Sequence, residues 1–234
     1  MADLSAFPVT KRWPPAHPDR LQLYSFPTPN GVKVSAMLEE TGLPYEAHLV
    51  NIFADDQKTD EFVSLAPNGK IPAILDPDGP EGAPLGLFES GAILLYLAEK
   101  TGKLMPAGAA ERWHAIQWLM FQMGGIGPFF GQMGHFYKFA ADRITDPYPT
   151  ERYVNEARRL TSVLNARLQG RDYVMGSDYT IVDIAIWPWV RTALDFYEAG
   201  EAIGIDDFPA VEDWLDRCME RPASMAALNI PPRP

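Results

Sequence analysis

The chain has 234 residues, of which 47% are hydrophobic and 22% charged, and its formal net charge is −11. These values are typical of a globular protein with one large domain or two small ones. The acidic balance argues against nucleic acid and anionic membrane surfaces as partners, because proteins bind both through an excess of Lys and Arg.

Cysteine and histidine usage narrows the chemistry further. The only cysteine is Cys218, which rules out an intramolecular disulfide, a CxxC redox pair and a Cys-rich metal site. The four histidines lack metal-ligand spacing, so we expect no metal. No apolar run approaches the roughly 18 residues of a membrane span, and the first residues lack the pattern of a signal peptide. We therefore expect a cytoplasmic protein with no membrane partner.

Residues 1–20 contain four prolines and predict an irregular arm that is not a domain of its own. Two interpretations stay open for it, a segment that wraps a partner subunit and a loosely ordered tail.

Residues 21–102 carry alternating strand and helix patterns. In chain order these predict a strand at 21–26, a helix at 32–41, a strand at 45–51, a short helix or loop at 55–66, strands at 71–76 and 85–88, and a helix at 90–101. The first two strands flank a helix and should be parallel, whereas the last two form a hairpin. The order β-α-β-α-β-β-α predicts an α/β thioredoxin-like domain.

Residues 103–230 read as an all-α helical-bundle domain that follows a short linker. Apolar residues at helical spacing predict helices at 111–124, 149–168, 180–199 and 209–220. Thr180 and Asp183 form a capping box, in which the side chain of each residue accepts a backbone hydrogen bond near the start of a helix. We expect this box to serve folding and not catalysis.

The pair Ile71 and Pro72 opens a predicted strand after a tight turn. A cis bond here would turn the backbone N–H and C=O of Ile71 toward a cleft, where an extended peptide pairs as an added strand. The alternative is a trans proline on an edge strand.

The pair Glu89 and Ser90 marks the end of a strand and the start of a helix. Free N–H groups and the Ser90 hydroxyl suit a carboxylate there, and Glu89 suits an ammonium group, so the turn can bind the head of an α-amino acid. The alternative is a plain serine N-cap.

These two segments within a thioredoxin-like plan resemble the glutathione site of cytosolic glutathione transferases, and the resemblance covers about residues 21–230. In that family the first motif holds the cysteinyl backbone of glutathione and the second holds its γ-glutamyl head. The resemblance also implies a homodimer.

Further strings resemble the bacterial Nu class of this family, whose members bind two glutathione thiols or glutathione disulfide in one site and act mainly as disulfide-bond reductases. The strings are Thr-Pro-Asn-Gly-Val-Lys at 28–33, the segment 88–97, Gly-Gly-Ile-Gly-Pro at 124–128, Glu-Arg-Tyr at 151–153 and Ile-Trp-Pro-Trp at 186–189. The resemblance implies bound glutathione, one or two molecules per site, as the source of the reactive thiolate.

Carried over by position, the family's roles fall on ten residues. These are Thr28 and Asn30 at the sulfurs, Gln57 and Lys70 at the glycyl end, Ile71 on the peptide backbone, Glu89 and Ser90 at the γ-glutamyl head, Arg152 on a carboxylate of the second glutathione, and Gln122 and Gln132 as weaker second-site candidates. Arg152 also reads as a solvated helix charge and Gln57 as part of a polar loop. We expect Lys33 to be an exposed helix residue and Cys218 a bystander.

Two other functions stay open. Glutathione transfer to an electrophile, including aryl-ether cleavage, would use a second pocket lined by Phe129, Phe130, Phe136 and Tyr137, whose alternative role is core packing. A non-catalytic glutathione-binding or regulatory module would keep the head-group turn and lose the sulfur-side group, and the retained Thr28 and Asn30 argue against it.

Overall fold

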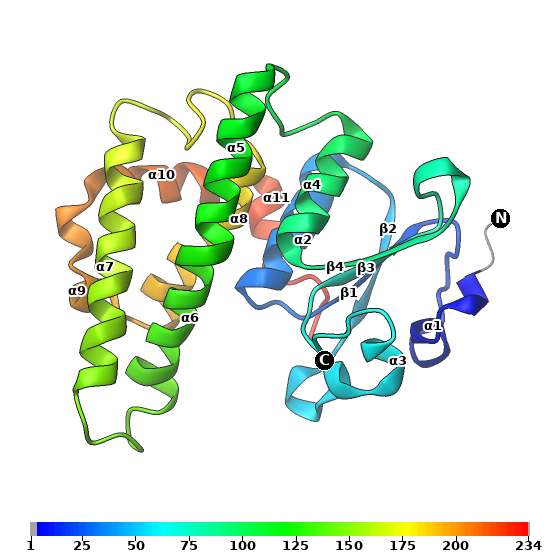
Figure 1. Cartoon of the computed structure of the whole chain (residues 1–234), viewed down its shortest axis with the longest axis horizontal. Helices are drawn as coiled ribbons and strands as arrows, with labels where there is room; N and C mark the ends of the chain where they lie inside the picture. Colours follow the sequence, from blue (N-terminus) through cyan, green and yellow to red (C-terminus); the bar gives the residue numbers. More distant parts are fainter. Residues whose placement is uncertain (1–3, 234) are drawn as a thin grey trace. The chain divides into compact units, whose positions relative to one another are not determined.

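The computed structural model describes residues 4–233, and the chain divides into two compact units (Figure 1). The first unit takes the chain up to Lys103 together with the segment that begins at Pro222, and the second runs from Leu104 to Arg221. This division differs from the expected one, in which the helical domain ran from 103 to 230. The difference arises because α11 (Pro222–Ala227) packs against α2 (Pro29–Thr41) of the first unit.

The first unit contains a four-stranded sheet in the order β2-β1-β3-β4. Its strands are β1 (Leu21–Ser25), β2 (Tyr45–Leu49), β3 (Ala73–Asp76) and β4 (Leu85–Phe88). β1 and β2 are parallel, whereas β3 is antiparallel to both β1 and β4. The predicted parallel pair, the hairpin and the thioredoxin-like fold are therefore confirmed.

Helices complete this unit. α2, α4 (Ser90–Thr101) and α11 form one packed group, and the short helices α1 (Val9–Arg12) and α3 (Asp60–Val63) form another. All five residues of β1 are buried. Single 3-10 turns η1, η2, η3 and η4 lie at Leu4–Ala6, Ile52–Ala54, Asp56–Lys58 and Pro80–Gly82.

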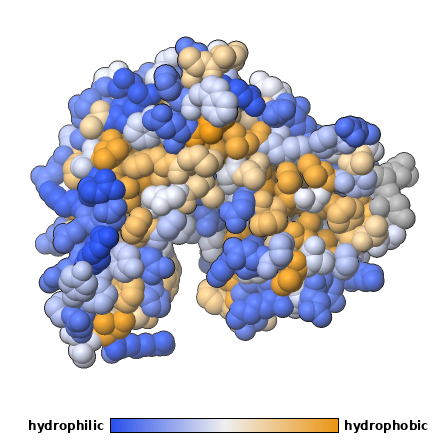
Figure 2. Space-filling view, viewed as in Figure 1, coloured by the Kyte–Doolittle hydropathy of each residue, from blue (hydrophilic) through white to orange (hydrophobic). Residues whose placement is uncertain are grey.

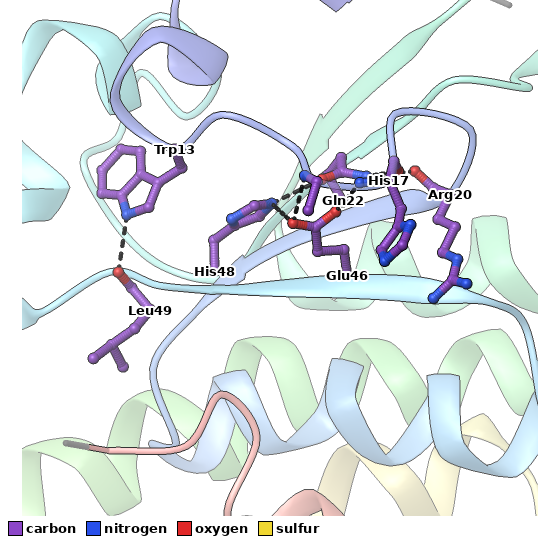
Figure 3. A network of polar contacts seen from close by, with 8 residues as sticks. Trp13, His17, Arg20, Gln22, Glu46, His48 and Leu49 are labelled. Carbon is purple, nitrogen blue, oxygen red and sulfur yellow. Dashed lines mark hydrogen bonds and ion pairs between the residues drawn. The ribbon is translucent and has the colours of Figure 1, made fainter.

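The N-terminal arm is bound to the edge strand β2. The Glu46 carboxylate accepts the N–H groups of Ala16 and His17 at 2.9 and 2.7 Å, and the Trp13 indole N–H donates to the carbonyl of Leu49 at 3.0 Å (Figure 3). The arm also supplies buried residues to the core that includes β1 and α3. Over residues 4–20 the second of the two interpretations, a loosely ordered tail, is wrong, because these contacts make the arm part of the first unit.

The second unit is all-α, as predicted. Its helices are α5 (Ala109–Phe121), α6 (Gly127–Gly134), α7 (Tyr148–Leu168), α8 (Ile181–Arg191), α9 (Gly200–Ile203) and α10 (Pro209–Met219). Three π-helical turns, η5 (Gln122–Ile126), η6 (His135–Phe139) and η7 (Thr192–Phe196), follow α5, α6 and α8, and a 3-10 turn η8 lies at Ile205–Asp207. The exposed residues of α7 are mostly polar, and the side of the second unit drawn at the left of Figure 2 is largely hydrophilic. Sequence periodicity missed α6, because five glycines from 124 to 134 weaken the helical pattern.

α8 starts with the predicted capping box. The Thr180 hydroxyl accepts from Val182 N at 3.2 Å, and Asp183 Oδ2 accepts from Thr180 N at 2.9 Å. The other Asp183 oxygen accepts from Val174 N and from the Trp214 indole N–H, each at 2.9 Å. Asp183 is fully buried. Through these hydrogen bonds its carboxylate links the start of α8 to the preceding loop and to α10.

Among residues 4–233, no helix combines the length and the apolar character that crossing a membrane requires.

Candidate functional site

Three chain segments of the first unit meet at one edge of the sheet. Tyr24 of β1 pairs with Ala73 of β3, and Ala73 also pairs with Phe88 of β4. Because both pairings are antiparallel, the end of β1, the start of β3 and the end of β4 lie side by side. This edge therefore gathers the sulfur-side turn, the proline turn and the head-group turn that the sequence singled out.

The sulfur-side turn leads from β1 into α2. Thr28 is the N-cap of α2, its N–H donates to the Phe26 carbonyl at 2.7 Å, and its hydroxyl makes no capping hydrogen bond. Asn30 follows in the first turn of the helix, and both residues are half-buried. A Cβ on Gly31 would lie 1.9 Å from the Phe26 carbonyl oxygen, so only glycine permits this close approach of helix and turn. The result presents a hydroxyl and an amide at the positive end of a helix.

The strand residues beside that turn are shielded from solvent. Tyr24 and Ser25 are both fully buried. Burial raises the pKa of the Tyr24 hydroxyl far above its ordinary value, and the charge of Glu46 adds to the effect. A phenol held in this state is unsuited to activating a thiol at neutral pH.

The proline turn has the geometry considered from the sequence, because the Ile71–Pro72 bond is cis. Pro72 is buried and Ile71 is half-buried. Within the described chain, neither the N–H nor the C=O of Ile71 forms a hydrogen bond. This backbone is therefore available to pair with an added extended peptide.

The head-group turn joins β4 to α4. Glu89 is exposed and has φ 71° and ψ 111°, a conformation that side-chain-bearing residues rarely adopt. α4 has no side-chain cap, and within residues 4–233 the N–H groups of Gly91 and Ala92 form no hydrogen bond. Ser90 is 4% exposed. This turn leaves helix-start donors available for an anion.

Lys33 departs from the expectation of an exposed helix residue. It is only 1% exposed, and its ammonium donates to Ser90 Oγ at 3.3 Å. Burial lowers the pKa of Lys33 to about 7, and the charge of Glu89 acts in the opposite direction. The expectation was wrong because α4 and α11 both pack against α2 and cover residues 31–38 completely. A charged residue within an otherwise uncharged stretch was the only signal in the sequence.

The predicted glycyl-end residues lie beside each other. Gln57 is in η3, and its main-chain oxygen would be 3.3 Å from a Cβ on Gly69, which precedes Lys70. The Gln57 side-chain oxygen is buried and has no hydrogen-bond partner within the described chain, while Lys70 is exposed. The Arg12 guanidinium of the arm pairs with Asp56 and so fixes the same turn.

The second-site candidates lie in the second unit and differ in exposure. Arg152, in the first turns of α7, has a side chain that is 50% exposed and reaches Glu156 at 3.9 Å. Gln132 is exposed on α6. Gln122 is fully buried, and its side-chain nitrogen would be 2.9 Å from a Cβ on Gly127, which favours a packing role.

The aromatic residues considered for an electrophile pocket also differ in their burial and contacts. Phe130 is a buried core residue. Phe136 stacks on Tyr153 with ring centroids 5.3 Å apart, and Phe129 lies 6.3 Å from the same ring. Among the described residues, no cluster of three or more His, Cys, Asp or Glu side chains is arranged to hold a metal ion.

One neighbour of the sulfur-side turn could not be predicted from the sequence around that turn. Arg233, from the segment after α11, donates to the Pro27 carbonyl at 3.3 Å and lies 5.1 Å from the Phe26 ring centroid. Ser35 of α2 donates to the carbonyl of Ile230 in the same segment at 3.1 Å. Residues 230–233 therefore contact and support the turn that carries Thr28.

Comparison with curated proteins gives relatives over most of the chain. The disulfide-bond oxidoreductase YfcG of Escherichia coli is 45% identical over 209 residues, which are 89% of this chain and 94% of that protein. The disulfide-bond oxidoreductase YghU of the same organism is 43% identical and matches 88% of this chain and 73% of its own length.

Solved structures resemble the whole chain. A glutathione transferase from Burkholderia graminis with two glutathione molecules bound per subunit is 62% identical, with a TM-score of 0.99 over 100% of this chain and 98% of that one. A glutathione transferase from Pseudomonas putida with one glutathione disulfide bound per subunit is 58% identical, with a TM-score of 0.96 over 98% and 99% of the two chains.

Family models agree with these matches. The glutathione S-transferase N-terminal domain matches residues 28–100, and the C-terminal domain of the same family matches residues 145–222. The resemblance drawn from the sequence is confirmed, and the chain belongs to the glutathione S-transferase family.

Proposed function

We propose that this protein is a glutathione-dependent disulfide-bond oxidoreductase in which both reacting thiols come from bound glutathione. The observation that carries the proposal is the sheet edge where Thr28 and Asn30, the cis Ile71–Pro72 bond and the Glu89–Ser90 turn come together. Relatives named disulfide-bond oxidoreductases and similar structures with two glutathiones or glutathione disulfide bound support it.

Each part of the edge has a complementary part of glutathione. The N–H and C=O of Ile71 pair with the cysteinyl backbone, and Gln57 and Lys70 bind the glycyl carboxylate. Glu89 binds the γ-glutamyl ammonium, and Ser90 with the start of α4 binds its carboxylate. This pose directs the cysteinyl sulfur to Thr28 and Asn30, where the hydroxyl, the amide and the start of α2 lower the pKa of the thiol.

The reaction needs no protein cysteine. The thiolate of the first glutathione attacks one sulfur of a small disulfide, forms a mixed disulfide and releases one substrate thiolate, which takes up a proton. The thiolate of a second glutathione then attacks the glutathione sulfur of the mixed disulfide, so that glutathione disulfide forms and the second substrate thiol leaves. The single cysteine, Cys218, is buried in α10 and contributes nothing to this scheme.

We extend the proposal to the second glutathione and to the assembly. Arg152 binds a carboxylate of the second molecule, with Gln132 as a further candidate and Gln122 a weaker one because it is buried. The protein is a homodimer in the cytoplasm. Titration calorimetry with glutathione should give two molecules per chain, and Arg152→Ala should remove the second while the first still binds.

The decisive experiment removes the amide at the sulfur. Asn30→Ala should lower the rate of glutathione-dependent reduction of a small disulfide by about 100-fold, the usual scale for losing one donor to a developing or stabilised anion. Asn229→Ala is the matched control, because Asn229 is an exposed asparagine of the same unit. Unchanged turnover in Asn30→Ala, with glutathione bound normally, contradicts this role.

A second candidate function is glutathione transfer to an aromatic electrophile or an aryl ether. It is favoured by the aromatic group of Phe129, Phe136 and Tyr153 next to Arg152. Assays of a chloronitrobenzene and an aryl ether beside the disulfide separate the two reactions. Glutathione binding with no turnover of any of the three substrates identifies a binding module instead.

A further inference from the structure

Lys33 occupies an unusual position for a cation. Its ammonium lies in the first unit beneath the start of α4, 3.3 Å from Ser90 Oγ and 1% exposed as a residue. Transfer of an ammonium group from water into a protein interior costs several kcal/mol unless charges and hydrogen bonds compensate. The start of a helix carries partial positive charge, so α4 itself repels the ammonium.

The ionisable side chains on the elements around α2 bear on the charge of this ammonium. Of the elements packed against α2, α11 has no ionisable side chain, and α4 places Tyr96, Glu99 and Lys100 in its later turns. The charge of Glu89 reaches Lys33 and favours its charged form. Glu89 is itself exposed, and in the proposed complex it binds the γ-glutamyl ammonium. A bound anion at the start of α4 would add a negative charge near Lys33 and favour its charged form.

The hydrogen bond to Ser90 has a definite direction. An ammonium group has three donors and no acceptor, so Ser90 Oγ must accept from Lys33 and its own proton must point elsewhere. When Lys33 loses a proton, its nitrogen gains a lone pair that can accept the Ser90 proton. Protonated Lys33 therefore fixes Ser90 Oγ as the acceptor of this hydrogen bond and directs the Ser90 proton to another acceptor.

We propose that Lys33 is a positioning residue for glutathione, which holds Ser90 so that the hydroxyl donates to the γ-glutamyl carboxylate and whose charge strengthens the anion site at the start of α4. The inference rests on the proposed glutathione site and adds to it the group that controls the head-group subsite. Lys33 need not touch the ligand for this role.

Proton linkage follows from the position of Lys33. Its pKa is lowered to about 7 in the free protein by burial, so near neutral pH a large share of the molecules carry a neutral amine. A bound carboxylate favours the charged form and raises this pKa, so binding above pH 7 takes up a proton at Lys33. Affinity should fall as the pH rises through 7.

The test is titration calorimetry with S-methylglutathione, which keeps the γ-glutamyl head and has no titrating thiol. At pH 7.5, in two buffers of different ionisation enthalpy, the wild-type protein should take up part of a proton on binding. Lys33→Met should abolish this uptake and raise Kd about tenfold or more at pH 6, where the wild-type lysine is charged, the scale for losing a charge-assisted donor. An analogue without the γ-glutamyl α-carboxylate should bind wild type and Lys33→Met equally.

Lys103→Met is the matched control. Lys103 follows the end of α4, and its ammonium donates to the Thr41 carbonyl at 2.7 Å at the opposite end of α2, so this variant removes a lysine that contacts the same helix and should keep both affinity and proton uptake. Thermal unfolding supplies a second reading. Lys33→Met should have an equal or higher Tm, because it replaces a buried charge by an apolar chain.

The outcomes are separable. Binding by the wild type with no proton uptake overturns the role of Lys33 and leaves the glutathione site intact, and this reading holds even if Lys33→Met fails to fold. A lower Tm with unchanged Kd and uptake in Lys33→Met identifies a structural role and also overturns the inference. No binding of S-methylglutathione or glutathione by the wild type contradicts the proposed function itself.

Discussion

Two helix starts in this molecule use similar residues for different ends. At α8, Thr180 and Asp183 satisfy the backbone, and Asp183 is fully buried with hydrogen bonds to Val174 and Trp214. At α4, no side chain caps the helix, and the N–H groups of two first-turn residues form no hydrogen bond within the described chain.

The difference lies in where the compensating charge comes from. The α8 start receives its negative charge from Asp183, within the chain, and is complete without a ligand. The α4 start has a cation, Lys33, beneath it and a residue of positive φ, Glu89, before it. Both features cost free energy in the free protein, which is the pattern of a site prepared for an anion. The role of a helix start therefore follows from which of its backbone groups and charges the chain itself satisfies and which it leaves for a ligand.

The largest expected effect comes from removing the carboxylate at the start of α8. Asp183→Ala leaves Val174 N, Thr180 N and the Trp214 indole N–H buried without their acceptor, and should lower the free energy of unfolding by about 3–5 kcal/mol. Urea unfolding of the variant measures this. Asp178→Ala, at an exposed aspartate of the same loop, should change stability by less than about 0.5 kcal/mol. Comparable losses in the two variants would contradict the role given to Asp183.

Removing the hydroxyl at each helix start separates the effect on ligand binding from the effect on stability. Ser90→Ala should raise the glutathione Kd about tenfold or more, because a donor to the carboxylate is lost. Thr180→Ala should leave Kd unchanged and lower stability by about 1 kcal/mol, the usual cost of an N-cap. Calorimetric Kd values and urea unfolding of both variants provide the measurement. An equal Kd for Ser90→Ala and wild type would mean that Ser90 is a plain packing residue.

The smallest expected effect concerns backbone strain. Glu89→Gly should raise the free energy of unfolding by about 1 kcal/mol, because glycine adopts φ 71° without steric cost, while glutathione binding weakens for want of a carboxylate. Glu81→Gly is the control, since Glu81 is an exposed residue with φ 61° in the turn between β3 and β4. It should gain similar stability and keep the glutathione Kd. If Glu89→Gly bound glutathione normally, Glu89 would not be the ammonium partner.

Local chemistry in the sequence determined much of this protein. Alternation and helical spacing predicted the strand and helix order of the first unit, because those periods follow from backbone geometry alone. The capping box at Thr180 and Asp183 could be predicted from the sequence because its hydrogen bonds, apart from those that Asp183 accepts from Val174 and Trp214, join residues within four positions of each other. The turns at Ile71 and Glu89 were found for the same reason, whereas the turn at Thr28 was identified through the resemblance to the glutathione transferases.

Tertiary structure decided the features that depend on distant segments. Lys33 is buried because α11, nearly two hundred residues away in the sequence, covers α2 together with α4. The arm is ordered because Glu46 binds the backbone of residues 16 and 17 (Figure 3). Periodicity within one element reports the face that its own neighbours bury, and it carries no information on a face covered from elsewhere in the chain. The sequence by itself thus located the head-group turn, and only the packing of α4 and α11 on α2 placed a buried ammonium beneath it.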